Sequence, residues 1–202
     1  MTPGAPGPHP EPPADLDDRE PLIASVDQVW FRIYKLRRGP IFFGRGRTHR
    51  FNAPGGEFGV MYMGGDEHCA FVETLGQETG CRIVTTAELL KRGWARVSLS
   101  RSVRLIDLVA SGGLARIGAD ARLFAGEHSV SQRWAKALWA HRARPDGILY
   151  PTRHDPARPA CALYDHCETL VKARPLGCVA DPKHSALLGN ILDTYGFELI
   201  DA

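Results

Sequence analysis

The stretch GVMYMGGDEHCAFVETL, residues 59–75, decides the fold of this chain. Its apolar run at residues 60–63 has the character of a buried strand and breaks at Gly64 and Gly65. Asp66 then stands where a helix N-cap is expected, and the apolar residues that follow recur at helical spacing. We therefore predict a strand, a tight turn and a helix, in that order.

Glu73 lies within this predicted helix, two positions after Phe71 and two before Leu75. An element with these neighbours is expected to be largely buried, and carboxylates are rarely buried without a partner. The side chain of Glu73 is therefore expected to form an ion pair, to remain half exposed, or to serve the chemistry of a site.

Length and composition indicate one domain. A chain of 202 residues can bury a real core, and a content of 44% hydrophobic and 24% charged residues is ordinary for a soluble globular protein. There is no apolar run near the roughly 20 residues of a membrane helix, and the N-terminus lacks the pattern of a signal peptide. We expect a cytoplasmic protein that contacts no membrane.

Residues 1–22 differ from the rest of the chain. They hold five acidic residues against one arginine, and seven of the fifteen prolines fall among residues 1–21. Because this segment has almost no large apolar residue to bury, we predict a disordered acidic tail at 1–22 and a folded domain at 23–202. The folded part is modestly basic, which suits a phosphate-bearing small molecule and lacks the Lys/Arg runs of a nucleic-acid surface.

The segment VDQVWFRIY, residues 26–34, alternates as a strand does and places Arg32 on the face of Trp30 and Tyr34. That face can form a ligand pocket, or the arginine stem can simply cover the aromatic rings.

A Gly- and Arg-rich loop follows at residues 37–58. It contains part of a dinucleotide fingerprint, but His49 occupies the third glycine position and no helix pattern follows, so we reject a Rossmann fold. The loop can still cradle phosphates, with Arg50 and Phe51 as the first candidate contacts; the alternative is a plain surface loop.

The remaining pattern mixes strands and helices unevenly. Strands are predicted at residues 81–85, 94–99, 103–108, 148–150, 161–164, 170–173 and 197–200, and helices at 86–92, 129–141 and 181–195. This order favours a mixed α+β domain over a regular βαβ repeat. Thr152 and Arg153 follow one predicted strand within DGILYPTRHDP, residues 146–156, where side chains commonly face ligands, although Thr152 can also be a turn residue.

Three motifs in this order resemble the RES domain family. They are WFRIY at residues 30–34, RFNAPGGEFGVMYMGGDEHCAFVET at 50–74 and WAKALWAHRARPDGILYPTRHDP at 134–156. The resemblance is strongest over residues 28–165. It assigns the family's arginine to Arg32, its glutamate to Glu73 and its serine position to Thr152, with Tyr62 as the aromatic residue before the glutamate. Thr152 keeps the hydroxyl of that serine but adds a methyl group and a stiffer side chain.

The resemblance implies a toxin of a RES/Xre-type toxin-antitoxin pair, with a fold similar to that of ADP-ribosyltransferases. Such a protein consumes NAD as a phosphorylase or hydrolase, with inorganic phosphate as co-substrate in the first case and no further cofactor. Some family members are ADP-ribosyltransferases. The implied partner is an Xre-like helix-turn-helix antitoxin that covers the active site, and a homodimer remains open as an assembly.

The implied chemistry needs only one carboxylate, because nicotinamide leaves as a neutral base, whereas glycosidases usually need two carboxylates. We expect Glu73 to stabilise the positive ribose centre and Arg32 to bind the diphosphate or ribose. Tyr62 would stack on nicotinamide, and Thr152 would orient the ribose or the incoming phosphate through one hydrogen bond. Arg50 and Arg153 are candidates for binding an acceptor phosphate.

Two rival hypotheses remain. A RES-like scaffold can bind a nucleotide or a partner protein without turnover, and the change from Ser to Thr at Thr152 favours this alternative. A metal hydrolase would use the His166 and Cys167 pair or the His68 and Cys69 pair, but adjacent residues do not easily converge on one ion, and HExxH and CxxC spacings are absent. We therefore predict no metal site.

Overall fold

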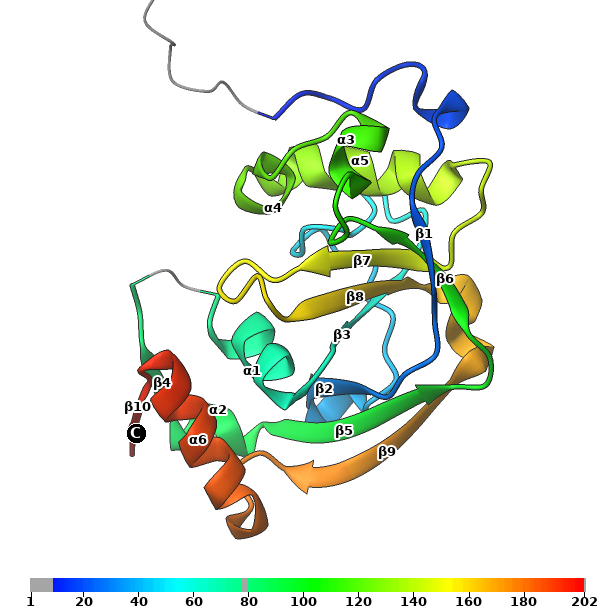
Figure 1. The fold of residues 1–202 in the computed structure, drawn as a ribbon. Helices are drawn as coiled ribbons and strands as arrows, with labels where there is room; N and C mark the ends of the chain where they lie inside the picture. The colour runs from blue at the N-terminus through cyan, green and yellow to red at the C-terminus, as the bar shows by residue number, and fades with distance from the viewer. Residues whose placement is uncertain (1–8, 78–79, 202) are drawn as a thin grey trace, which may run out of the picture.

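The structure is a computed structural model that describes residues 9–77 and 80–201. Its centre is a curved sheet of eight strands (Figure 1). In sheet order the strands are β1 (Ile23–Val26), β6 (Val103–Asp107), β7 (Gly147–Pro151), β8 (Pro159–Tyr164), β3 (Val60–Gly64), β2 (Trp30–Lys35), β5 (Arg92–Leu99) and β9 (Val171–Cys178). Neighbouring strands are antiparallel except β6 and β7, which are parallel. The predicted mixed α+β class is confirmed.

The helices gather at two ends of this sheet. Figure 1 shows α3 (Gly113–Ile117), α4 (Arg122–Ala125) and α5 (His128–Ala140) together beside β7. At the other end lie α2 (Thr86–Leu90), α6 (Ser185–Tyr195) and a small parallel sheet of β4 (Ile83–Thr85) and β10 (Glu198–Ile200). Helix α1 (Glu67–Leu75) lies between the two groups and contacts β2 and β3. The core is correspondingly divided, with one cluster under α5 and another shared by α1 and α6.

The unit from β3 to α1 forms as the sequence predicts. The Asp66 side chain caps α1 by accepting a hydrogen bond from the backbone N–H of Cys69 at 2.8 Å. Gly64 is needed at the end of β3 because a Cβ there would lie 2.5 Å from the backbone nitrogen of Ala70. The absence of a side chain at Gly64 therefore lets α1 lie directly against the strand that precedes it.

The predicted strand at residues 26–34 is in fact two strands. β1 pairs with β6 at one edge of the sheet, whereas β2 pairs with β3 and β5 farther across it. The residues between them are exposed. Alternation of apolar residues predicts extended backbone, but it does not say which strands will pair with it. The sequence therefore did not predict that the extended segment is interrupted at residues 27–29.

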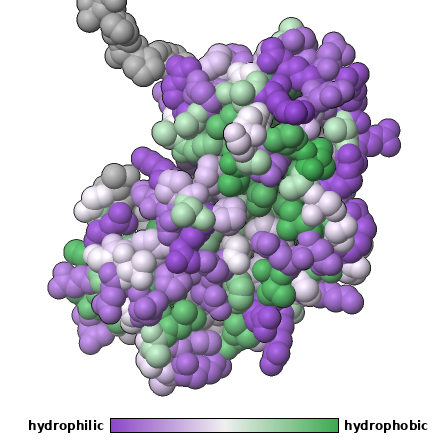
Figure 2. Space-filling view, in the orientation of Figure 1, coloured by the Kyte–Doolittle hydropathy of each residue, from purple (hydrophilic) through white to green (hydrophobic). Residues whose placement is uncertain are grey.

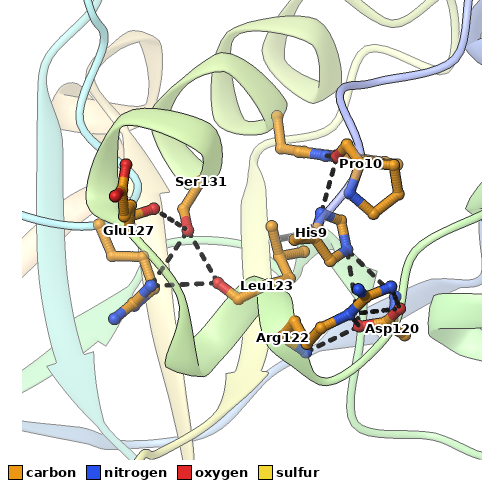
Figure 3. A network of polar contacts seen from close by, with 9 residues as sticks. His9, Pro10, Asp120, Arg122, Leu123, Glu127 and Ser131 are labelled. Carbon is orange, nitrogen blue, oxygen red and sulfur yellow. Dashed lines mark hydrogen bonds and ion pairs between the residues drawn. The ribbon is translucent and has the colours of Figure 1, made fainter. Parts of the chain in front are cut away.

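The prediction of a disordered tail at residues 1–22 is wrong for residues 9–22, and residues 1–8 lie outside the described part. The indole N–H of Trp134 donates to the carbonyl of Pro10 at 2.8 Å, Leu16 is 5% exposed, and Glu11 pairs with Arg133. Figure 3 shows His9 beside Asp120, whose backbone N–H donates to the ring. The segment is ordered because its acidic and apolar residues meet basic and aromatic side chains on α5.

The hydropathy of one face of the molecule, the length of the helices and the state of the cysteines are ordinary in the part of the chain that the structure describes. The face in Figure 2 is mostly hydrophilic, with hydrophobic residues in scattered groups. Among residues 9–77 and 80–201, no helix is long and apolar enough to cross a bilayer. All five cysteines are free thiols, and Cys69, Cys161 and Cys167 are buried.

Candidate active site

A cavity of about 660 Å³ opens among β2, β3, α1, the end of β7 and the loop before β3. This volume lies within the range of small-molecule sites, roughly 300–1,000 Å³. Among the described residues that line it, seven are Lys or Arg, three are His, and one is acidic. The cations are Arg32, Lys35, Arg38, Arg45, Arg50, Arg92 and Arg153, and the acid is Glu73. Arg45 and Arg92 have carboxylate partners in Asp165 and Glu88, so a strong positive excess remains for an anionic ligand.

Glu73 enters the cavity from the last turns of α1 and is half-buried. The hydroxyl of Tyr150, on β7, donates to its Oε2 at 3.0 Å. Burial raises the pKa of Glu73 above its usual value, and the Tyr150 hydrogen bond, the backbone N–H of Arg153 and the charge of Arg50 act in the opposite direction. In the part of the chain that the structure describes, Glu73 is thus the carboxylate of this site, and a few named groups favour its ionised form.

Arg32 reaches the same cavity from β2. Its two Nη atoms donate to the carbonyls of Tyr62 at 3.3 Å and Phe42 at 3.2 Å. Its Nε–H is buried and has no partner among the described residues. Burial lowers the pKa of Arg32 to about 10, so the guanidinium stays charged at neutral pH. A half-buried cation with an unused donor at a cavity wall is equipped to bind an anion.

Tyr62, on β3, contributes its aromatic ring to the cavity wall, while its hydroxyl is already hydrogen-bonded within the protein. Its hydroxyl accepts from the backbone N–H of Phe51 at 3.0 Å and donates to Oδ1 of Asn52 at 2.9 Å. The ring of His49 lies beside it, with 5.4 Å between ring centroids. Phe51 borders the cavity, but its side chain is completely buried and packs edge-on against Tyr150 at 4.9 Å. Phe51 therefore supports the wall that Tyr62 and Tyr150 form.

Arg50 and Arg153 both line the cavity, as predicted for phosphate contacts. Arg50 is held by hydrogen bonds to the carbonyl of Gly126 at 2.8 Å and to Oγ of Ser131 at 3.1 Å. Ser131 is itself fixed by donating to the carbonyl of Leu123, as Figure 3 shows. Arg153 is exposed and follows β7. One guanidinium is thus anchored and the other is free to adjust to a ligand.

A RES domain family model matches residues 29–183, which is most of the chain and includes every cavity residue named above. The chain belongs to the RES domain family. The predicted resemblance over residues 28–165 is therefore confirmed and extends farther along the chain.

One sequence relative and one solved structure are similar to this chain. A probable toxin, y4kH of Sinorhizobium fredii (strain NBRC 101917 / NGR234), is 31% identical over 115 residues, which cover 56% of this chain and 87% of that protein. A chain in the crystal structure of the M. tuberculosis MbcT–MbcA toxin-antitoxin complex aligns with a TM-score of 0.58 and 14% identity. That alignment covers 85% of this chain and 92% of the other, and it shows a shared fold.

This RES domain brings Arg32, Glu73 and Tyr62 to one cavity but does not place the side chain of Thr152 there. Thr152 is 1% exposed, and its hydroxyl donates to the carbonyl of Asp155 at 2.7 Å. It is absent from the cavity lining, although the residues on either side of it are present. The structure therefore does not support the predicted contact between the Thr152 hydroxyl and a substrate in this cavity. β7 ends at Pro151, so the alternation of the strand does not continue into the turn.

The sequence analysis missed Tyr150, which supplies the hydroxyl beside Glu73, and also Asn52 and His49. A signal for Tyr150 was present, because a tyrosine in a buried strand needs a partner for its hydroxyl. Nothing local to the loop sequence identifies Asn52 or His49, since their place depends on how the loop folds over β3.

The residues considered for a metal hydrolase have other partners. His166 and Cys167 lie near Asp146, and one ligand atom from each is within 4.8 Å of the others. The Asp146 carboxylate already binds Arg101, with Nη1 to Oδ2 at 2.9 Å, and this charge opposes a cation. His68 instead contacts Asn190.

Proposed function

We propose that this protein breaks the N-glycosidic bond between nicotinamide and ribose in NAD and acts as the toxin of a toxin-antitoxin pair. The observation that carries the proposal is that Glu73 is the one carboxylate among the described residues of a cavity whose lining also holds several cations and aromatic rings. Membership in the RES domain family and the relative named as a probable toxin also support it.

A single carboxylate suits this reaction. When the bond between C1′ and nicotinamide breaks, nicotinamide takes the bonding electrons and leaves as a neutral molecule, so no acid has to protonate it. The ribose is left with oxocarbenium character, and the negative charge of Glu73 stabilises it. Because the carboxylate is half-buried, its interaction with that positive charge is less screened than it would be in water.

The cations suit the diphosphate of the substrate. Arg32 offers its unpartnered Nε–H from a buried position, and other guanidinium groups line the rest of the cavity. The ring of Tyr62 is half-buried at the wall and suits stacking with nicotinamide. These contacts would orient NAD with its reactive ribose near Glu73.

The acceptor is water or inorganic phosphate, which forms the new bond to C1′ from an oxygen atom. Arg50 and Arg153 line the same cavity as Glu73 and would bind the phosphate in phosphorolysis. An Xre-like helix-turn-helix antitoxin would neutralise the enzyme by covering this cavity, and the related fold in the MbcT–MbcA complex makes an antitoxin partner a reasonable hypothesis.

The test compares the Glu73→Gln variant with wild-type protein by measuring nicotinamide release from NAD by chromatography. Loss of the charge should lower release at least about 100-fold, since removing one electrostatic stabiliser of a transition state costs that much. Glu67→Gln is the matched control, because Glu67 lies on α1 outside the cavity. Equal release by wild type and Glu73→Gln would refute the assignment.

The same assay decides the acceptor and the main rival. A rate that increases with added inorganic phosphate identifies phosphorolysis, and a rate independent of phosphate identifies hydrolysis. Transfer of label from NAD to a protein would indicate an ADP-ribosyltransferase. Saturable binding of NAD by wild-type protein without any nicotinamide release would show that the protein is a nucleotide-binding module and not an enzyme.

A further inference from the structure

The end of β7 fixes the carboxylate of Glu73 from outside α1. The Tyr150 hydroxyl donates to Oε2 at 3.0 Å. Among the described residues, Tyr150 is the side chain that donates to this carboxylate. The backbone N–H of Arg153, three residues later, also lowers the pKa of Glu73, so one segment supplies two groups that favour its ionised form.

Tyr150 is itself rigidly placed. It lies on β7, between β6 and β8 in the sheet, and it is 5% exposed. The ring of Phe51 packs edge-on against it with 4.9 Å between centroids. A hydroxyl on a ring that is packed in this way has few alternative positions, so it can hold a flexible glutamate side chain.

The hydroxyls of Tyr62 and Thr152, the other two in the predicted site, are already committed. Tyr62 donates to Asn52 and accepts from Phe51, and Thr152 donates to the carbonyl of Asp155. We propose that Tyr150 is a positioning residue for Glu73: its hydroxyl fixes the carboxylate, in its ionised form, toward the cavity where the ribose would lie. This inference rests on the proposed function, because it concerns how the same carboxylate is positioned for the proposed reaction.

The electrostatics agree with this geometry. Burial raises the pKa of Tyr150 well above its usual value, so the phenol remains a proton donor throughout the physiological range. Burial also raises the pKa of Glu73, and donation from Tyr150 lowers it. The other charged or titratable groups coupled to this carboxylate are Arg50, Tyr62 and Cys69, and the backbone N–H of Arg153 also lowers its pKa. Removing the Tyr150 hydroxyl should therefore make Glu73 harder to ionise.

The first experiment measures the Glu73 carboxyl directly in the Tyr150→Phe variant. Carbon-13 NMR of protein labelled at glutamate follows the titration, and the Glu73→Gln variant assigns the signal. We expect the Glu73 pKa to be higher in Tyr150→Phe than in wild type. Tyr164→Phe is the matched control, because Tyr164 is completely buried, lies outside the cavity lining and donates to Ala135 at 3.5 Å.

The second experiment measures nicotinamide release as a function of pH. In Tyr150→Phe, kcat should fall roughly 10- to 100-fold near neutral pH, as expected for the loss of a hydrogen bond to a charged group, with little change in KM for NAD. The acidic limb of the profile should move to higher pH. Should Tyr150→Phe fail to fold, 3-fluorotyrosine placed at position 150 preserves the shape and strengthens the donor, and the limb should then move to lower pH.

The outcomes separate this inference from the proposed function. An unchanged Glu73 pKa in Tyr150→Phe overturns the inference, and so does a raised pKa with unchanged kcat and an unchanged pH profile. If wild-type protein releases no nicotinamide, the proposed function fails instead, and the carboxyl titration alone decides whether the Tyr150 hydroxyl holds Glu73.

Discussion

Asp146 lies directly before β7, and its carboxylate connects the start of that strand to residues of three other positions in the chain. It is 5% exposed. Arg101 donates to both of its oxygens, at 2.9 and 3.2 Å, the backbone N–H of Arg104 donates at 2.8 Å, and the Cys167 thiol donates at 3.2 Å. We predict that Asp146→Asn lowers the stability of the fold markedly at neutral pH.

The magnitude follows from the carboxyl pKa. Burial raises it, but the hydrogen bonds from Arg101, Arg104 and Cys167 lower it more, so that it falls from 3.8 to about 2. A difference of this size corresponds to about 2 kcal/mol of folding free energy, since one pKa unit is worth about 1.4 kcal/mol. Because the folded-state pKa is the lower one, this stabilisation is present above about pH 4 and is lost as the pH falls toward 2.

Urea unfolding followed by tryptophan fluorescence measures the effect. At pH 7 the free energy of unfolding of Asp146→Asn should be roughly 2 kcal/mol below that of wild type, and the difference should shrink by pH 3. Asp27→Asn is the control, because Asp27 is exposed and forms no hydrogen bond or ion pair with any residue that the structure describes. Equal stability of Asp146→Asn and wild type at pH 7, or a difference that does not depend on pH, would refute the reasoning.

Three further predictions concern Glu73, Leu16 and Gly64. Burial raises the folded-state pKa of Glu73, so the ionised carboxylate costs stability once the pH exceeds its unfolded value; Glu73→Gln should raise the melting temperature at pH 8, and this gain should vanish by pH 4 in calorimetry. Leu16→Ala should cost about 2 kcal/mol or more in urea unfolding because Leu16 belongs to the core under α5, whereas a disordered tail would show no change. Gly64→Ala places a Cβ 2.5 Å from the nitrogen of Ala70, so α1 must shift and nicotinamide release should fall; unchanged release would show that the helix position is not critical.

The sequence alone determined the local elements of this protein. The apolar run before Gly64 and Gly65, the cap at Asp66 and the helical spacing up to Glu73 predict β3 and α1 because these preferences depend on residues a few positions apart. The same holds for α5 and for most strands. The family resemblance added Arg32, Glu73 and Tyr62, and all three line one cavity.

Only the tertiary structure decided which hydroxyl meets Glu73. Tyr150 and Glu73 are 77 residues apart, and their contact exists because β7 and α1 are packed into one domain. The neighbouring Thr152 turns away at the end of the strand, and the segment around Leu16 is ordered only because α5 offers it a surface. Such contacts depend on long-range packing, and hydrophobic periodicity along the chain carries no information about which distant elements will meet.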